Sequence, residues 1–195
     1  MARNLEFEPD KALEKAMLLF WKKGASGTSV EDLVQATKVQ RSGLYNVFGG
    51  KNNLLKKSLE LYISQVIDVN TRALRQQNAD LGAIRSFFEQ FLHLLDHPMA
   101  KYGCLMCFSA MEIAKIDRGA AKIVNSSISK IESYFVDALT NAQLRNCRSE
   151  TQILEQAHFF LGSVFAINSL LRAGVSEGVV KNYITGVLKI VDNLS

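Results

Sequence analysis

Apolar residues recur at helical spacing along almost the whole chain. Between Leu13 and Trp21 they fall three and four residues apart, which places them on one face of an α-helix. The same spacing returns in every later part of the sequence. The predicted helices span residues 9–23, 28–36, 40–47, 51–77, 80–96, 103–115, 118–145, 150–173 and 177–193. The pattern therefore predicts an all-α protein of about nine helices.

Polar residues that cap helices stand before the second predicted helix. The pair Thr28 and Ser29 is followed three residues later by Glu31 and Asp32. A Ser or Thr with an acidic residue three positions on can satisfy two backbone N–H groups at a helix start. Two overlapping capping boxes are therefore expected here.

The second and third predicted helices are short and are separated by a break at residues 37–39. Two such helices, packed on a first one, make a helix-turn-helix, whose second helix enters the major groove of DNA. We therefore expect an N-terminal three-helix head, residues 1–50, and a larger C-terminal helical domain, residues 51–195. The residues expected to point outward from the third helix are Arg41, Ser42, Tyr45 and Asn46.

Basic residues are concentrated near this segment. Residues 21–60 hold seven Lys or Arg against three Asp or Glu, an excess of four that equals the net charge of the whole chain. A local basic excess suits a polyanionic partner contacted by one end of the molecule.

Residues 12–62 resemble the DNA-binding segment of the TetR family. The matching motifs, in chain order, are LFWKKG, TSVEDL, Leu44-Tyr45, Phe48, and Lys51 followed by Leu54-Leu55. The resemblance implies a homodimeric transcriptional repressor that binds double-stranded operator DNA and is released by a small-molecule effector. The residues that it places against DNA are Thr28, Ser29, Gln40, Arg41, Ser42, Tyr45, Asn46 and Lys51. Among them Arg41 is expected to read a base, because a guanidinium can bond O6 and N7 of guanine together.

Two residues depart from the family pattern. Lys38 stands where the family usually has a glycine with positive φ, and Gly43 stands where it usually has Ser or Thr. These departures leave open an alternative, a helical small-molecule-binding protein whose DNA-binding head has lost sequence specificity. An enzyme is not expected, because no Ser/His/Asp order, phosphate-binding glycine loop or facing carboxylate pair occurs, and no cofactor is expected.

The region from residue 80 to residue 173 is rich in Phe, Met and Leu. The resemblance implies a pocket there for an apolar or amphipathic effector, and apolar cavities with a few polar groups are the general form of such sites. The candidate lining residues are Phe87, Phe91, His93, Met106, Met111, Tyr134, His158 and Asn168. Phe and Met at helical spacing also fit an ordinary packed core, so both interpretations remain.

Cys104 and Cys107 are three residues apart, which puts both thiols on one face of a helix. A thiol sensor needs a lowered pKa and access to solvent, whereas the apolar neighbours favour buried, inert thiols. His93 and His97 have the spacing of a metal-binding pair, but Pro98 follows directly and no metal site is expected.

The last two predicted helices are apolar on more than one side, and Gly162, Ser163 and Ala166 would allow close approach of another helix. We expect a four-helix interface between two copies of the chain, whose two-fold symmetry matches a palindromic operator. The N-terminus has no apolar core typical of a signal peptide, and no charge-free apolar run reaches the roughly 18 residues of a membrane span. No membrane contact is expected, and the expected location is the cytoplasm.

Overall fold

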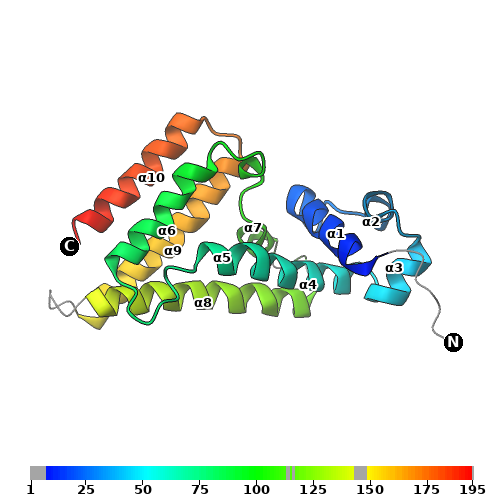
Figure 1. The fold of residues 1–195 in the computed structure, drawn as a ribbon, viewed down its shortest axis with the longest axis horizontal. Coiled ribbons are helices and arrows are strands. Elements are labelled where there is room, and N and C mark those ends of the chain that lie inside the picture. The colour runs from blue at the N-terminus through cyan, green and yellow to red at the C-terminus, as the bar shows by residue number, and fades with distance from the viewer. Residues whose placement is uncertain (1–7, 113–114, 116, 143–148, 195) are drawn as a thin grey trace. The chain divides into compact units, whose positions relative to one another are not determined.

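The computed structural model describes residues 8–112, 115, 117–142 and 149–194, and all the regular structure among them is helical (Figure 1). The predicted all-α class is confirmed. The chain forms two compact units. The first comprises Met1–Gln65 with Cys104–Asn125, and the second comprises Val66–Gly103 with Ser126–Ser195.

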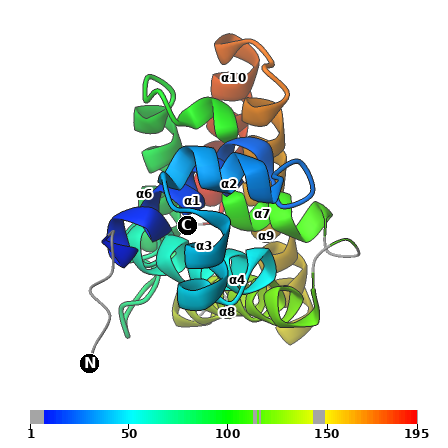
Figure 2. The same cartoon turned by 90° about the vertical axis from the view of Figure 1, so that its right-hand side faces the viewer.

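The first unit contains the predicted helix-turn-helix. Its helices are α1 (Pro9–Lys23), α2 (Val30–Thr37), α3 (Arg41–Phe48), α4 (Lys51–Tyr62), α7 (Leu105–Met111) and the start of α8 (Arg118–Ala142). α1 packs against α2 and α4, while α3 packs against α2 and α4 (Figure 2). The compact unit thus extends past residue 50, because α4 completes the support of the head; a functional boundary at residue 50 stays a prediction.

The predicted apolar stripe of α1 forms the centre of this unit. Ala16 and Phe20 have no exposed surface, and Met17 is almost as buried. Pro9 begins the helix, where its missing N–H costs nothing, and Gly24 ends it with φ +77°. Trp21 lies edge-on against the buried Tyr62 of α4, with ring centroids 4.8 Å apart.

One of the two capping boxes predicted for α2 forms. The Ser29 hydroxyl oxygen accepts the Asp32 N–H at 3.0 Å, and the Asp32 carboxylate accepts the Ser29 N–H at 2.9 Å. The predicted box of Thr28 with Glu31 is wrong. Thr28 is buried and its hydroxyl donates to the carbonyl oxygen of Gly24 at 2.6 Å, so this side chain closes the turn after α1 instead.

We expect Ser29→Ala to lower the free energy of unfolding by about 1 kcal/mol, because the N–H of Asp32 loses its acceptor. Urea unfolding followed by circular dichroism measures this. Ser42→Ala is the matched control, since Ser42 is exposed within α3 and its loss is expected to change stability by under about 0.5 kcal/mol. Equal effects of the two substitutions would contradict a capping role.

Lys38 is the one non-glycine residue with positive φ in the described part of the chain. It ends α2 at φ 63°, ψ 22°, as the position predicts for the turn between α2 and α3. The left-handed conformation costs an L-residue about 1–2 kcal/mol. The turn therefore keeps the family geometry without the family glycine.

We expect Lys38→Gly to raise the free energy of unfolding, by at most about 1 kcal/mol, since the greater freedom of glycine in the unfolded chain offsets part of the relieved strain. Lys38→Ala removes the same charge but keeps Cβ, so it should give no such gain. The same urea titration compares both variants, and an equal gain for alanine would mean that charge, not backbone conformation, is responsible.

The helix predicted for residues 51–77 ends earlier, at residue 70. α4 continues through a π-helical stretch, Ile63–Ile67, into the single turn α5 (Asp68–Asn70). The hydroxyl of Thr71 then donates back to the carbonyl oxygen of Ile67 at 2.7 Å. The following backbone bonds include tight i to i+3 turns, such as Gln76 N–H to Ala73. These local bonds replace the last predicted turns of the helix.

The second unit is built around an aromatic core. Its helices are α6 (Leu81–Leu94), the 3₁₀ turn Ala100–Tyr102, the rest of α8, α9 (Glu150–Arg172) and α10 (Glu177–Asp192). α10 packs against both α6 and α9 (Figure 1). Phe88 is fully buried, and its ring centroid lies 5.2–6.3 Å from those of its aromatic neighbours. These neighbours are Phe87, Phe91, Phe135 and Phe160.

The helix predicted for residues 103–115 is shorter in the structure. The helix predicted from residue 103 begins at Leu105 and ends at Met111, because Gly103 has φ +59° and lies against the carbonyl oxygen of Asn168. The predicted end of α8 at residue 145 lies outside the described residues. Within the described ranges, no helix combines the length and apolar character needed to cross a membrane.

Candidate nucleic-acid interface

α3 presents one exposed polar face and one buried apolar face. Leu44 and Phe48, one turn apart, are 2% and 6% exposed and fix the helix against the rest of the head. The exposed residues are those predicted from the sequence: Gln40 just before the helix, and Arg41, Ser42, Tyr45 and Asn46 within it. The structure thus brings five of the eight predicted DNA-binding residues together on one surface.

Tyr45 links this face to the start of α4. Its side chain is 52% exposed, yet one ring edge lies close to Gly50, where an added Cβ would meet Cε1 at 3.0 Å. Gly50 has φ +93°, so a side chain there would be both strained and crowded. Lys51 follows as the first residue of α4 and is half-buried. Tyr45, in α3, and Lys51, at the start of α4, therefore lie on two helices that follow each other in the chain.

Arg41 forms an exposed ion pair with Glu31 of α2. Both side chains are more than half exposed, and such surface pairs contribute only about 0–1 kcal/mol. The pair holds the Arg41 guanidinium at the first turn of α3. Because the ion pair is weak, the guanidinium can exchange Glu31 for another hydrogen-bond acceptor at little cost in free energy.

The start of α2 already carries a negative charge. The Lys23 ammonium, 2.7 Å from Asp32 Oδ1, together with the N–H and hydroxyl of Ser29, holds the pKa of the Asp32 carboxyl well below its usual value. The exposed Ser29 is therefore engaged in the capping box. Thr28 does not fit the predicted phosphate contact, because its hydroxyl proton is donated internally to Gly24. Any phosphate at this helix end must compete with Asp32.

The predicted effector-pocket residues do not gather around one cavity. In the second unit, Phe87 and Phe91 pack in the aromatic core with centroids 5.7 Å apart, and the buried Asn168 donates to the carbonyl oxygen of Val164. His93 is exposed, and His158 is an exposed partner of Glu132 at 2.9 Å, so neither faces an enclosed pocket.

The two methionines predicted for the pocket belong to the first unit. Met106 is buried, but Met111 at the end of α7 is 57% exposed, which does not fit a place inside an apolar pocket. His97, which has the spacing of a metal-binding pair with His93, accepts the backbone N–H of Met99 through Nδ1. No cluster of three potential metal ligands occurs in the described ranges.

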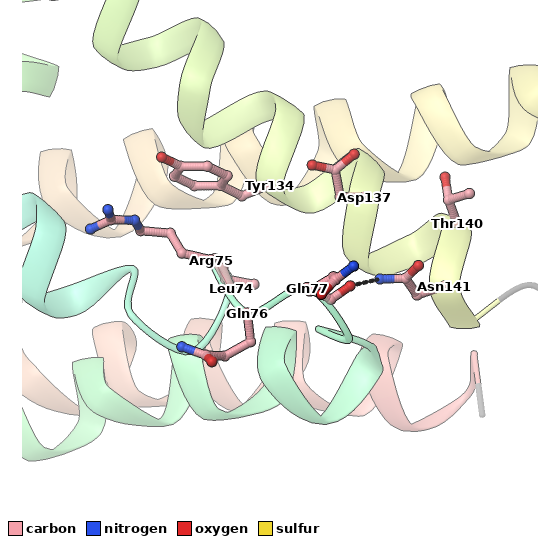
Figure 3. A pocket seen from close by; sticks show the side chains of 8 residues that line it. All are labelled: Leu74, Arg75, Gln76, Gln77, Tyr134, Asp137, Thr140 and Asn141. Atoms are coloured by element: carbon pink, nitrogen blue, oxygen red, sulfur yellow. Dashed lines mark hydrogen bonds between the residues drawn. The ribbon is translucent and has the colours of Figure 1, made fainter.

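An open hollow of about 320 Å³ lies in the second unit, between the turn after α5 and one side of α8 (Figure 3). Its lining residues are Leu74, Arg75, Gln76, Gln77, Tyr134, Asp137, Thr140 and Asn141. The Asn141 amide donates to the carbonyl oxygens of Gln77 at 3.2 Å and Ala79 at 2.9 Å, which fixes the turn on α8. Of the predicted residues only Tyr134 lines it, because the sequence pattern predicted a helix where the turn lies.

The predicted thiol pair lies at the start of α7. Cys104 is the residue before the helix and is partly exposed, whereas Cys107 in its first turn is buried. Both thiols are free.

Comparison with known proteins gives consistent results. The family model described as "Bacterial regulatory proteins, tetR family" matches residues 12–57, which cover most of α1, all of α2 and α3 and half of α4. The uncharacterized HTH-type transcriptional regulator YezE of Bacillus subtilis is 27% identical over 143 residues, 73% of this chain and 74% of the relative. The HTH-type transcriptional repressor ComR of Escherichia coli is 32% identical over 101 residues, but the match spans only 51% of this chain and 48% of ComR.

The fold similarity extends over nearly the whole chain. A cysteine mutant of the TetR family transcriptional regulator CifR, complexed with 26-base-pair double-strand operator DNA, superimposes with a TM-score of 0.82. The identity is 19%, and the match covers 96% of this chain and 98% of that one. The matched motif and the exposed face of α3 agree on a DNA-binding transcriptional regulator. Residues 12–57 thus match the TetR family of bacterial regulatory proteins, and the whole chain has the fold of a solved TetR-family regulator.

Proposed function

We propose that the protein is a cytoplasmic, homodimeric repressor that binds a palindromic operator through α3 and leaves it when a small molecule binds. The observation that carries this proposal is the exposed face of α3, held by the buried Leu44 and Phe48. An α-helix with one free polar face, braced from behind, has the form needed to enter a major groove. ComR, named as a repressor, and CifR, solved with operator DNA, are relatives whose names support the assignment.

The proposed DNA contacts divide by chemistry. Arg41 reads a guanine through two parallel hydrogen bonds, exchanging its ion pair with Glu31 for the base edge. Gln40 and Ser42 lie beside it and approach neighbouring bases. Contacts to sugar and phosphate come from Ser29, Tyr45, Asn46 and Lys51. Thr28 acts only through the backbone turn that it closes.

The proposed dimer forms through α9 and α10. In α10 the exposed Val179, Tyr183 and Ile190 follow one stripe, with Gly186 between them. In α9 the exposed Phe159 lies next to Gly162, above which there is open space. Exposed apolar side chains flanking glycines on adjacent helices suit the close packing of two further helices against them. A two-fold dimer also gives the symmetry that an inverted repeat requires.

We assign DNA binding to residues 1–50 and effector binding and dimerisation to residues 51–195. The hollow beside Tyr134 is lined by charged and amide groups as well as Leu74, which favours an amphipathic effector over a purely apolar one. An effector shifts the DNA-binding equilibrium only by its difference in affinity for the two conformations. Native mass spectrometry of the purified dimer, followed by addition of any ligand found, tests this: the ligand should lower DNA affinity.

Selection of bound duplexes from a random-sequence pool tests the proposed function. We expect enrichment of an inverted repeat whose half-sites lie about one helical turn, 34–36 Å, or a multiple of it apart. Uniform recovery of all sequences would contradict the proposal and favour the alternative, a helical ligand-binding protein with a nonspecific head. The same selection with Arg41→Ala shows whether the enriched bases depend on α3.

A further inference from the structure

Two thiols meet at the start of α7 in the sequence Cys104-Leu105-Met106-Cys107. Cys104 precedes the helix in an extended conformation, φ −100° and ψ 127°, and Cys107 is the third residue of the first turn. The side chain of a residue just before a helix can reach the third helical residue, and the two thiols lie within hydrogen-bonding reach of each other. Tyr62 of α4, which is 2% exposed, completes the cluster from the side.

The two thiols differ strongly in acidity. Interaction with the Cys107 thiol, then with the Cys107 N–H and the Tyr62 hydroxyl, lowers the pKa of Cys104 from 9.0 to about 7, although burial acts against this. The Cys104 sulfur, followed by burial, raises the pKa of Cys107. Burial, followed by the charge on Cys104, raises the pKa of Tyr62. Near neutral pH a substantial fraction of the partly exposed Cys104 is therefore thiolate, while Cys107 and Tyr62 stay protonated.

The C-terminal end of α7 contacts the turn between α1 and α2. The Glu112 carboxylate accepts the backbone N–H groups of Ala25, at 3.0 Å, and Ser26, at 3.4 Å, in the turn between α1 and α2. The Phe108 ring lies directly against Gly24, so a side chain at that position would collide with it. A change in the first turn of α7 can thus reach the helix-turn-helix within seven residues of chain.

We propose that Cys104 and Cys107 are a dithiol that hydrogen peroxide oxidises to a disulfide, and that this bond loosens the contact of α7 with the turn between α1 and α2. The Cys104 thiolate attacks one peroxide oxygen, the O–O bond breaks, and the protonated leaving oxygen departs as water, leaving a sulfenic acid. The Cys107 sulfur then displaces that hydroxyl as a second water. Two thiols lose two electrons and two protons in total, and one peroxide is reduced to two waters.

Closing the disulfide constrains the start of α7. Cys104 is the extended residue before the helix and Cys107 is its third residue. A disulfide holds its two Cβ atoms about 3.5–4.5 Å apart. The bond therefore fixes the first turn of α7, and Phe108, whose ring contacts the turn between α1 and α2, follows Cys107 directly. Any effect on operator binding rests on the proposed function; the thiol chemistry and the movement of the turn do not.

The thiol chemistry is tested first, in the full chain with Cys147→Ser so that the third cysteine does not interfere. Iodoacetamide should alkylate Cys104 with a pH midpoint near 7, and Cys107→Ala should move this midpoint upward toward 9.0. Hydrogen peroxide followed by mass spectrometry should show the loss of two hydrogens from the peptide with both cysteines, reversed by dithiothreitol. In Cys107→Ala it should show one added oxygen on Cys104 instead. An unmodified peptide, or a midpoint independent of Cys107, overturns the proposal.

Hydrogen exchange and DNA binding then test the switch. Oxidation should speed exchange at the amides of Ala25 and Ser26 about tenfold, and Glu112→Gln should speed it already in the reduced protein. The affinity for a duplex selected by the reduced protein should fall about tenfold on oxidation, and not in Cys107→Ala. A disulfide without faster exchange overturns the switch. If the reduced protein selects no duplex, the proposed function fails, while alkylation and exchange still decide the thiol switch.

Discussion

Glutamate at both Phe159 and Tyr183 is expected to convert the proposed dimer into a monomer and to weaken binding of an inverted-repeat duplex by about 10²–10⁴-fold. Both side chains lie on the exposed apolar surface of α9 and α10, where they are 41% and 37% exposed in the single chain. Two charges in the centre of a buried interface have no partner and cannot be solvated there. Each monomer would then bind one half-site without the gain in affinity that a linked second monomer provides. Sedimentation equilibrium gives the oligomeric state, and fluorescence anisotropy of the labelled duplex gives the affinity.

The matched control adds two glutamates elsewhere on the surface, at Ser133 and Thr185, which are exposed and lie outside the apolar stripe. This variant should remain a dimer with unchanged affinity. Both double variants should keep the circular dichroism of the parent, because none of the four positions is buried in the chain alone. A stable dimer carrying glutamate at Phe159 and Tyr183 would place the interface on another surface.

Removing the Arg41 side chain should cost about 1–3 kcal/mol in binding the selected duplex, which corresponds to roughly 10–100-fold in affinity. Arg41 is exposed at the first turn of α3, where helix-turn-helix proteins contact base edges. Binding to a scrambled duplex should fall much less, because a base contact contributes nothing there. Anisotropy titrations of both duplexes at one salt concentration measure the two losses.

Arg72→Ala is the control for Arg41→Ala, since it removes the same charge from an exposed position in the second unit. It should leave both affinities nearly unchanged. Glu31→Gln should not weaken binding, because it only frees the Arg41 guanidinium from its ion pair. Equal losses on the selected and scrambled duplexes for Arg41→Ala would show that this residue contacts phosphates and reads no base.

The head could be predicted well because its determinants are local. The Ser29–Asp32 capping box, the glycines after α3 and the alternation of Leu44 with exposed neighbours all act within a few residues. Thr28 was the exception. Ser and Thr have the same capping chemistry, and only the position of the Gly24 carbonyl decides that Thr28 turns inward.

The C-terminal site could not be predicted in the same way. Phe87 and Phe91 have the spacing of either a pocket or a core. Only the contact of Phe87 with Phe135 of α8, and the packing of Phe91 against Phe87 and Phe88, decide for the core. The sequence pattern predicted a helix through residue 77, but the helix ends at residue 70, and the turn that follows forms one side of the hollow. Glu112 was missed altogether, because the N–H groups that it accepts are 86 and 87 residues away in the sequence and no local motif signals such a contact.

The contact between Trp21 and Tyr62 has a practical consequence for spectroscopy. Trp21 is the single tryptophan of the protein, and it belongs to the first unit, with its ring against the tyrosine beside the two thiols. Fluorescence excited at a wavelength that only indole absorbs will therefore report on the first unit and not on the phenylalanine-rich second unit. Emission during chemical denaturation should therefore follow the melting of the head, while far-ultraviolet ellipticity follows all the helices. The order in which the two halves unfold can be read from the difference between these two curves without attaching any dye.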